Sequence, residues 1–269
     1  MDIRSLGYRT DVMLRVLEGS ECADHGDYLV IRSPANPQFW WGNFLLLAAP
    51  PEPGGAGKWL SRFAAEFPAA GHLTLGIDVT DQGAVNPAEF QAAGLRFERA
   101  VVLTAAVVHQ PPRPNLAAQY RPLAGPCDWQ QAAELRAACD PDDEPGGGRD
   151  FLERRIAAQR RLTEDGHGSW FGAFTGGQLA AQLGIFSAGR GIARYQSVET
   201  HPAARGQGLA GTLVCQAGRW AMAELGASTL VIVAKSGHQA ERVYRSVGFE
   251  AAEDSVSFER PPARWRFAA

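Results

Sequence analysis

The sequence predicts an α/β protein with mixed sheets, built from two related units in tandem. Its 269 residues exceed the ~150 of an average domain, and a hydrophobic content of 45% supports packed cores. Segments with helical and strand periodicity follow one another in a mixed order rather than in strict alternation. A strand–helix–glycine pattern also occurs twice at a shared offset, which indicates duplication.

A proline-rich segment divides the two units. His109–Asn115 reads H-Q-P-P-R-P-N, and its closely spaced prolines predict a semi-rigid linker. The preceding run Val101–Val108 is apolar, so we expect a buried strand that closes the first unit. The predicted domains are therefore residues 1–108 and 116–269, with 109–115 between them.

The second unit is predicted to begin with a strand at Gln119–Leu123. Two helices follow at Trp129–Ala138 and Phe151–Leu162, where apolar residues recur at helical spacing. The stretch Asp140–Gly148 between them is polar and rich in glycine and proline, so we expect a loop there.

A hairpin comes next, with strands at Trp170–Phe174 and Gln178–Ser187 around the turn T-G-G. A strand at Ile192–Thr200 follows, and then a long helix with one apolar face, formed by Leu209, Leu213, Ala217, Trp220 and Leu225. The last predicted elements are a strand at Ser228–Ala234, a short helix at His238–Ser246 and a C-terminal tail.

The repeat links the ends of the two units. In the first unit a strand at His72–Asp78 and a short helix at Pro87–Ala93 precede G-L-R-F-E. In the second unit the strand Thr229–Val233 and its short helix precede G-F-E. The two glycines, Gly94 and Gly248, stand 154 residues apart (248 − 94), and the strands are offset by nearly as much. A shared order at a shared offset predicts that the units are duplicates.

The charge pattern disfavours several classes of partner. A net charge of −3 without a basic stripe argues against nucleic acid and against an anionic membrane surface. The longest apolar run, Phe44–Pro51, is far shorter than the ~20 residues that span a bilayer. Charged residues interrupt the first nineteen positions, which disfavours a secretion signal.

Cysteine usage predicts a cytoplasmic protein without a metal site. The cysteines form no C-x-x-C pair and have no nearby histidine cluster, so we expect reduced, buried thiols. They are Cys22, Cys127, Cys139 and Cys215. Nearly all basic residues are arginine, a bias that hints at a GC-rich bacterial genome.

The richest stretch for function is Ser197–Leu213, where a strand, a glycine cluster and a helix follow one another. Glycines at a helix start let backbone N–H groups converge on an anion, which predicts a phosphate ligand. The plain alternative is a glycine turn that only begins the helix. A Walker loop is excluded because no lysine follows the glycines.

Gly206, Gly208 and Gly211 satisfy the dinucleotide pattern G-x-G-x-x-G. The glycines do not follow the strand directly, however, since Pro202 intervenes. The next strand ends in Ala-Lys rather than in the acidic residue that an NAD site requires. An NADP-binding oxidoreductase that uses Lys235 stays open as an alternative.

Arg205, Gly208 and Ala210 fill the pattern [QR]-x-x-G-x-[GA], which resembles the acetyl-CoA signature of the GNAT superfamily of N-acyltransferases. The resemblance extends to a second family signature, because Ala240 and Y-R-S-V-G-F at Tyr244–Phe249 match A-x-x-x-Y-x-x-x-G-F. It covers about residues 119–258, and more loosely the first unit.

The resemblance implies a fold of two tandem GNAT-like domains and an acetyl-CoA-dependent N-acetyltransferase without a metal. The strand end that would pair with the pantetheine arm is Val198, Glu199 and Thr200. The pyrophosphate would lie on backbone N–H groups of Gly206, Gln207, Gly208, Leu209, Ala210 and Gly211. Arg205 is either a phosphate contact or a structural ion-pair partner.

Tyr244 occupies the position of the family's general acid, with core packing as the alternative. A tyrosine of pKa about 10 can protonate or hydrogen-bond the departing thiolate of CoA. The general base stays open among a water relay, Glu199, His201 and His167. Strand alternation would place Glu199 on the face opposite Gln196, unless a bulge re-aims it.

The first unit lacks this machinery. Phe90 stands where Tyr244 is expected at the repeat offset, and the glycine cluster Pro53–Lys58 lacks the signature spacing. We expect a degenerate domain that supports the active one, with Phe39, Trp40 and Trp41 either in a core or lining the acceptor cleft. The acceptor is predicted to be a small-molecule or peptide amine and the protein a monomer or homodimer. A catalytically silent CoA-binding sensor is the remaining alternative.

Overall fold

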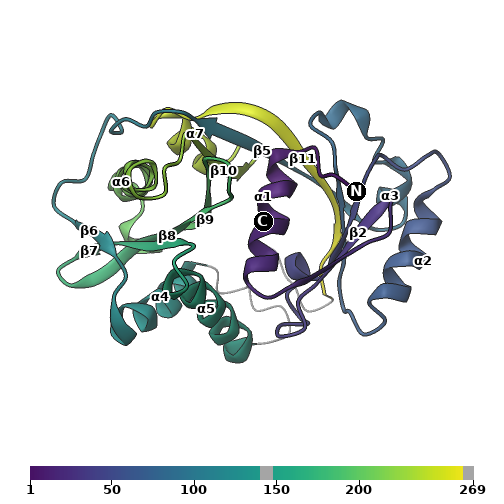
Figure 1. Cartoon of the computed structure of the whole chain (residues 1–269), viewed down its shortest axis with the longest axis horizontal. Helices are drawn as coiled ribbons and strands as arrows, with labels where there is room; N and C mark the ends of the chain where they lie inside the picture. Colours follow the sequence, from purple (N-terminus) through teal and green to yellow (C-terminus); the bar gives the residue numbers. More distant parts are fainter. Residues whose placement is uncertain (140–147, 263–269) are drawn as a thin grey trace. The chain divides into compact units, whose positions relative to one another are not determined.

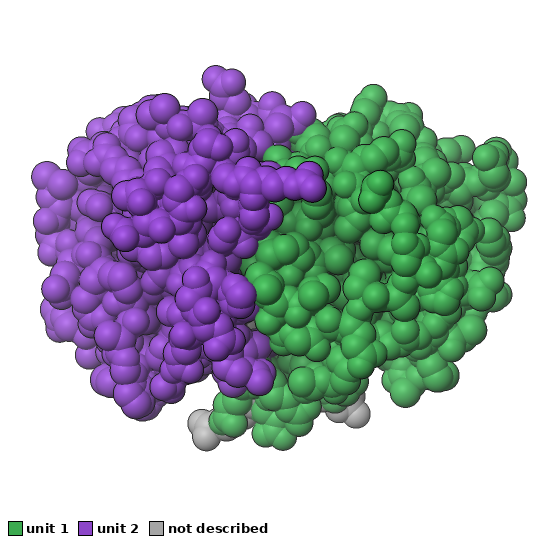
Figure 2. All heavy atoms as spheres, viewed as in Figure 1, with its two compact units in different colours: residues 1–101, 144–154, 253–269 green, residues 102–143, 155–252 purple. Residues whose placement is uncertain are grey.

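The computed structural model describes residues 1–139 and 148–262. These fall into two compact units, coloured separately in Figure 2. Within the described residues, unit 1 comprises 1–101, 148–154 and 253–262, and unit 2 comprises 102–139 and 155–252. The proline-rich segment 109–115 belongs to unit 2. The predicted loop at Asp140–Gly148 lies outside the described residues except for Gly148, which begins a helix.

Unit 1 has helices on a mixed sheet (Figure 1). Its strands follow the order β1-β2-β3-β4-β11, where β11 is Glu250–Arg260; β3 and β4 are parallel and the other neighbours antiparallel. The helices are α1 (Leu6–Leu17), α2 (Ala56–Glu66) and α3 (Ala88–Ala92). The first four strands are β1 (Glu21–Asp24), β2 (Tyr28–Arg32), β3 (Phe44–Leu47) and β4 (Leu73–Ile77).

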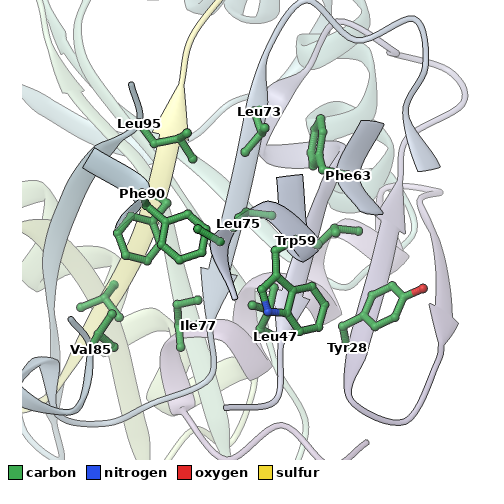
Figure 3. Close-up of a cluster of buried hydrophobic side chains, with 14 of the residues drawn as sticks. Tyr28, Leu47, Trp59, Phe63, Leu73, Leu75, Ile77, Val85, Phe90 and Leu95 are labelled. Atoms are coloured by element: carbon green, nitrogen blue, oxygen red, sulfur yellow. The ribbon is translucent and has the colours of Figure 1, made fainter. Parts of the chain in front are cut away.

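The core of unit 1 lies between α2, α3 and the central strands (Figure 3). Trp59 and Phe63 of α2 and Phe90 of α3 are buried against Leu75 and Ile77 of β4. Every residue of β3 and of β4 is buried, which agrees with parallel central strands covered on both faces. The apolar run that begins at Phe44 is therefore a core strand.

Unit 2 contains the predicted order of strand, two helices, three strands, helix, strand and helix. Its elements are β6 (Gln119–Pro122), α4 (Gly125–Cys139), α5 (Gly148–Glu164), β7 (Gly168–Thr175), β8 (Gln178–Ser187), β9 (Ile192–Thr200), α6 (Leu209–Glu224), β10 (Thr229–Lys235) and α7 (Gln239–Arg245). The first turns of α5, up to Arg154, belong to unit 1. The predicted T-G-G turn joins β7 to β8, with positive φ at Gly176 and Gly177. Such a pair of φ values suits the tight turn of a hairpin.

The duplication is confirmed in the order of elements. In the first half of the chain β4, α3 and β5 (Arg96–Ala105) follow one another, as do β10, α7 and β11 (Glu250–Arg260) in the second half. The strand predicted at 101–108 is only partly correct, because β5 begins at Arg96 and ends at Ala105.

The two halves exchange these last strands. β11 comes from the end of the chain but pairs antiparallel with β4, with Val256 opposite Ile77 and Phe258 opposite Leu75. The end of β5, from Val102 onward, belongs to unit 2 and neighbours β10. The prediction of a C-terminal tail after the last helix is therefore wrong up to Arg260, where β11 ends. The opening of β11, E-A-A-E-D, is charged and partly exposed and lacks the alternation that marks a strand.

The expectation of buried cysteines was wrong for two of them. Cys22 and Cys127 are exposed, Cys139 is half-buried and only Cys215 is buried. Among the described residues, no helix is both long and apolar enough to cross a membrane.

Candidate active site

Two parallel strands of unit 2 separate ahead of the glycine loop. β9 and β10 pair where Ile192–Arg194 lies opposite Thr229–Val231. Both strands then continue, β9 to Thr200 and β10 to Lys235, and no further pairing joins them in the described part of the chain. The later half of β9 therefore presents backbone N–H and C=O groups on the side toward β10, where an extended ligand can pair with them.

A β-bulge interrupts β9 in the same region. Gly184 of β8 lies opposite Gln196, whereas Gln182 lies opposite Glu199, so β9 contains one residue more than β8 over this interval. Ser197, within the bulge, has a positive φ of 46°. Glu199 consequently shares a face with Gln196, and the alternation expected from the sequence is corrected by this bulge.

Glu199 belongs to a chain of polar side chains. Its carboxylate lies 2.9 Å from the Arg136 guanidinium of α4 and accepts a 2.6 Å hydrogen bond from the Gln182 amide. The Gln182 amide oxygen in turn accepts a hydrogen bond from the Trp170 indole at 3.1 Å. This set of partners fixes the Glu199 side chain beside the separated strands.

The glycine loop forms an open cradle of backbone donors at the start of α6. Gly206 and Gly208 have φ values of 77° and 78°, and Gly208 is the N-cap of the helix. In the described residues, the first helical hydrogen bond runs from the Thr212 N–H to the Gly208 carbonyl. No protein acceptor in those residues takes the N–H groups of residues 206–211. Unpaired N–H groups at the positive end of a sixteen-residue helix suit an anion.

The corresponding helix start in unit 1 is closed by a carboxylate. Glu89 of α3 accepts hydrogen bonds from the N–H groups of Gly54 at 2.6 Å and Ala56 at 3.4 Å, at the beginning of α2. A side chain of unit 1 itself therefore fills the place that the glycine loop of unit 2 leaves open. This difference supports the expectation that the N-terminal half has lost phosphate binding.

Tyr244 lies buried on α7, at 5% exposure, with its ring centroid 6.4 Å from that of Phe249. Burial raises the pKa of Tyr244 well above its ordinary value, and the charge of Arg194 opposes part of that rise. The phenol is therefore neutral at physiological pH, which is the form that donates a hydrogen bond. In unit 1, Phe90 stacks on Phe258 with centroids 4.2 Å apart and has a packing role.

The other residues singled out in the sequence lie around the loop or away from it. Arg205 is exposed, and its Nε donates to the Thr200 carbonyl at 3.3 Å. His201 caps the turn before the loop, because its Nδ1 accepts the Ala203 N–H at 3.3 Å. The nitrogen that could take a proton is thus already in use. The carbonyl of His167 accepts the Ser187 N–H, at the end of β8 away from the loop.

A pocket of about 350 Å³ adjoins the turn at His201. Its walls include Gln131, Glu134, Thr175 and Gln178 from α4 and the β7–β8 hairpin. Two residues of the aromatic run contact other rings of unit 1. The ring centroids of Phe39 and Phe151 lie 6.1 Å apart, and those of Trp41 and Phe44 lie 5.5 Å apart.

Comparison with known proteins agrees with these features. The profile of the acetyltransferase (GNAT) family matches residues 129–249, which include β7 to α7. A search of curated proteins finds no match. Among solved structures, a GCN5-related N-acetyltransferase from Kribbella flavida is 17% identical with a TM-score of 0.64, covering 96% of this chain and 97% of its own.

Two further structures are similar over the whole length. A tandem GNAT protein from the clavulanic acid biosynthesis pathway is 15% identical with a TM-score of 0.54, covering 97% of this chain and 96% of its own. A protein of unknown function from Staphylococcus epidermidis is 10% identical with a TM-score of 0.70, covering 91% and 95%. At these identities the likeness concerns the fold. Residues 129–249 therefore match the GNAT acetyltransferase family, and the chain shares its fold with a tandem GNAT protein.

Proposed function

We propose that unit 2 transfers an acetyl group from acetyl-CoA to a primary amine. The observation that carries the proposal is the pairing of an open N–H cradle at residues 206–211 with an unpaired edge of β9. The first suits a diphosphate and the second suits an extended arm with amide groups. Acetyl-CoA contains both groups. Its pantetheine arm would lie along β9, and its diphosphate would lie at the glycine loop that follows β9 in the chain.

Each part of the cofactor has a proposed partner. Backbone groups of Val198, Glu199 and Thr200 pair with the pantetheine amides, as a neighbouring strand would. The N–H groups of the glycine loop, from Gly206 to Gly211, hold the diphosphate. Arg205 already donates to a backbone carbonyl through Nε, so its remaining guanidinium N–H groups are those available for a phosphate.

Tyr244 is the proposed proton donor. The amine nitrogen attacks the thioester carbonyl, the C–S bond breaks, and the departing sulfur takes up the electron pair. A neutral tyrosine beside that sulfur stabilises the developing thiolate by donating a hydrogen bond and supplies the proton as CoA leaves. The raised pKa of Tyr244 keeps this proton in place throughout the physiological range.

Glu199 is the proposed acceptor for the proton of the attacking amine, through a water molecule. The bulge places Glu199 on the same face as Gln196, and its ion pair with Arg136 holds the side chain in place. His201 is less suited because its Nδ1 is occupied. His167 lies at the far end of β8, about 20 Å along the strand at ~3.3 Å per residue.

Acyl transfer is tested by thiol release. The protein is mixed with acetyl-CoA and a panel of amines that includes aminoglycosides, polyamines, amino acids and peptides, and free CoA is measured. The proposal predicts acceptor-dependent release by at least one amine class. Binding of acetyl-CoA without release by any class would favour the silent sensor instead.

A further inference from the structure

The proline-rich segment 109–115 packs against the glycine loop of unit 2. A Cβ placed on Gly208 would lie 2.3 Å from the carbonyl oxygen of Arg113, and one on Gly211 would lie 3.1 Å from the Cβ of Pro111. The first distance is too short for any side chain. The loop and this segment therefore pack backbone against backbone, and Gly208 is required for that contact as well as for its positive φ.

Asn115 connects the segment to the glycine loop through two hydrogen bonds, and its other polar groups bond to the residues that follow it. Its side-chain amide donates to the Gln207 carbonyl at 3.0 Å, and its backbone N–H donates to the Thr212 hydroxyl at 3.0 Å. That hydroxyl donates in turn to the Gly208 carbonyl at 2.9 Å. The side-chain oxygen of Asn115 accepts the N–H groups of Ala117 and Ala118, and its carbonyl accepts the Tyr120 hydroxyl.

These bonds decide which way the loop's donors point. In a trans peptide the C=O and the following N–H point in opposite directions. Asn115 holds the Gln207 carbonyl toward the linker, so the N–H of Gly208 points away from it. The Thr212 hydroxyl donates to the Gly208 carbonyl, so the N–H of Leu209 points away from Thr212.

We propose that Asn115, acting with Thr212, is a positioning residue that presents the N–H groups of Gly208 and Leu209 to the diphosphate of the acyl-CoA. The inference rests on the proposed function and assigns to the linker a part in cofactor binding. It requires no contact between Asn115 and the cofactor. Its effect must therefore depend on the diphosphate and not on the acyl or pantetheine part.

The test compares Asn115→Ala, Thr212→Val and Thr212→Ser with the unaltered protein. Affinities are measured by calorimetry for CoA and for S-acetylpantetheine, a thioester that lacks the diphosphate. We expect about ten-fold weaker CoA binding for Asn115→Ala and Thr212→Val, equivalent to about 1.4 kcal/mol. The affinity for S-acetylpantetheine should change less than about two-fold, because this thioester has no diphosphate for the loop to bind. Thr212→Ser keeps the hydroxyl and should restore CoA affinity.

Asn86→Ala is the matched control. Asn86 caps a turn in unit 1 through the same kind of bond, because its side-chain oxygen accepts the N–H of Ala88, two residues on. Its loss should leave CoA affinity unchanged. Melting temperatures of all variants, measured without ligand, separate loss of the fold from loss of loop order.

Unchanged CoA affinity in folded Asn115→Ala and Thr212→Val would overturn this inference and leave the proposed function standing. Tighter CoA binding in these variants would overturn it too, since the linker would then be covering the loop. Equal losses for CoA and S-acetylpantetheine would mean a general structural effect and would also contradict it. A wild-type protein that binds no CoA would instead overturn the proposed function.

Discussion

The Glu89 carboxylate accepts the Gly54 N–H at 2.6 Å, so a side chain of unit 1 occupies the start of its own α2. The equivalent start of α6 in unit 2 has no such acceptor among the described residues. A carboxylate at a helix N-terminus satisfies the exposed donors and interacts favourably with the helix dipole. The two halves of the chain thus share an order of elements but use this position differently.

Glu89→Gln should therefore lower stability without affecting cofactor binding. Loss of a charged cap typically costs about 0.5 to 2 kcal/mol of unfolding free energy. Denaturant titration measures this loss, and calorimetry with CoA should give the wild-type affinity. Weaker CoA binding by a folded Glu89→Gln protein would show that unit 1 takes part in holding the cofactor.

Gly206 allows a clean test of the phosphate cradle. A Cβ at Gly206 meets nothing within 4 Å, whereas one at Gly208 would meet the Arg113 carbonyl, so a change at 208 would disturb packing as well. Gly206→Asp and Gly206→Asn are nearly identical in shape, and both residues tolerate positive φ. Only the aspartate repels a diphosphate. We expect CoA to bind at least about ten-fold more weakly to Gly206→Asp than to Gly206→Asn.

Equal CoA affinity of the two Gly206 variants would place the diphosphate elsewhere. The comparison should be made at low ionic strength, because salt screens an exposed charge.

Tyr244→Phe should lower kcat and leave acetyl-CoA affinity nearly unchanged. Assistance by a proton donor is typically worth about 100- to 10,000-fold, or about 3 to 5 kcal/mol of barrier. Single-turnover release of CoA thiol, with an acceptor from the amine panel, measures the effect. An unimpaired Tyr244→Phe enzyme would give Tyr244 a packing role only.

Phe90→Tyr is the reciprocal change in unit 1. It adds a hydroxyl at a residue that is 2% exposed and stacked on Phe258, so it should cost about 1 to 3 kcal/mol of stability. The turnover of the remaining folded protein should be normal. A large loss of kcat in folded Phe90→Tyr would mean that unit 1 contributes to the active site.

Glu199→Gln should reduce turnover at saturating substrates while CoA affinity stays within about two-fold, because the amide keeps the shape and loses the basic oxygen. Single-turnover release of CoA thiol measures the loss. An unimpaired Glu199→Gln enzyme would mean that another group or a water chain accepts the amine proton.

Alkaline pH should destabilise the fold through its buried tyrosines. Burial raises the pKa of Tyr8, Tyr195 and Tyr244, so the folded state holds these protons more tightly than the unfolded chain, where the pKa is about 10. Their stabilising contribution is complete below about pH 10 and falls as the pH rises toward the folded values. Urea midpoints measured from about pH 8 to 11 should stay level and then drop. Ultraviolet titration of all tyrosines near pH 10 in the folded protein would contradict this.

The sequence predicted unit 2 well because its elements carry strong local signals. The strands Gln178–Ser187 and Ile192–Thr200 were placed to the residue, and the T-G-G turn lies where the hairpin requires positive φ. The strand exchange could not be predicted in this way. Which strand neighbours β4 depends on pairing between residues far apart in the chain, and the charged opening of β11 gives no strand pattern.

The candidate site was only partly visible in the sequence. Glycine spacing and the tyrosine signature pointed to the loop and to Tyr244 because both depend on local residue order. The bulge at Ser197 reverses the face of Glu199, and no turn residue marks it. Asn115 looked like the end of a linker, and only the fold brings it to the loop.

Binding of acetyl-CoA in comparison with NADPH tests the central claim most directly. Each ligand is added at ~100 times its expected dissociation constant, where a specific ligand contributes roughly 2.7 kcal/mol of stability. The account predicts a clear rise in melting temperature with acetyl-CoA and none with NADPH, and Gly206→Asp should lose much of that rise. No shift with acetyl-CoA, or a larger one with NADPH, would contradict the account.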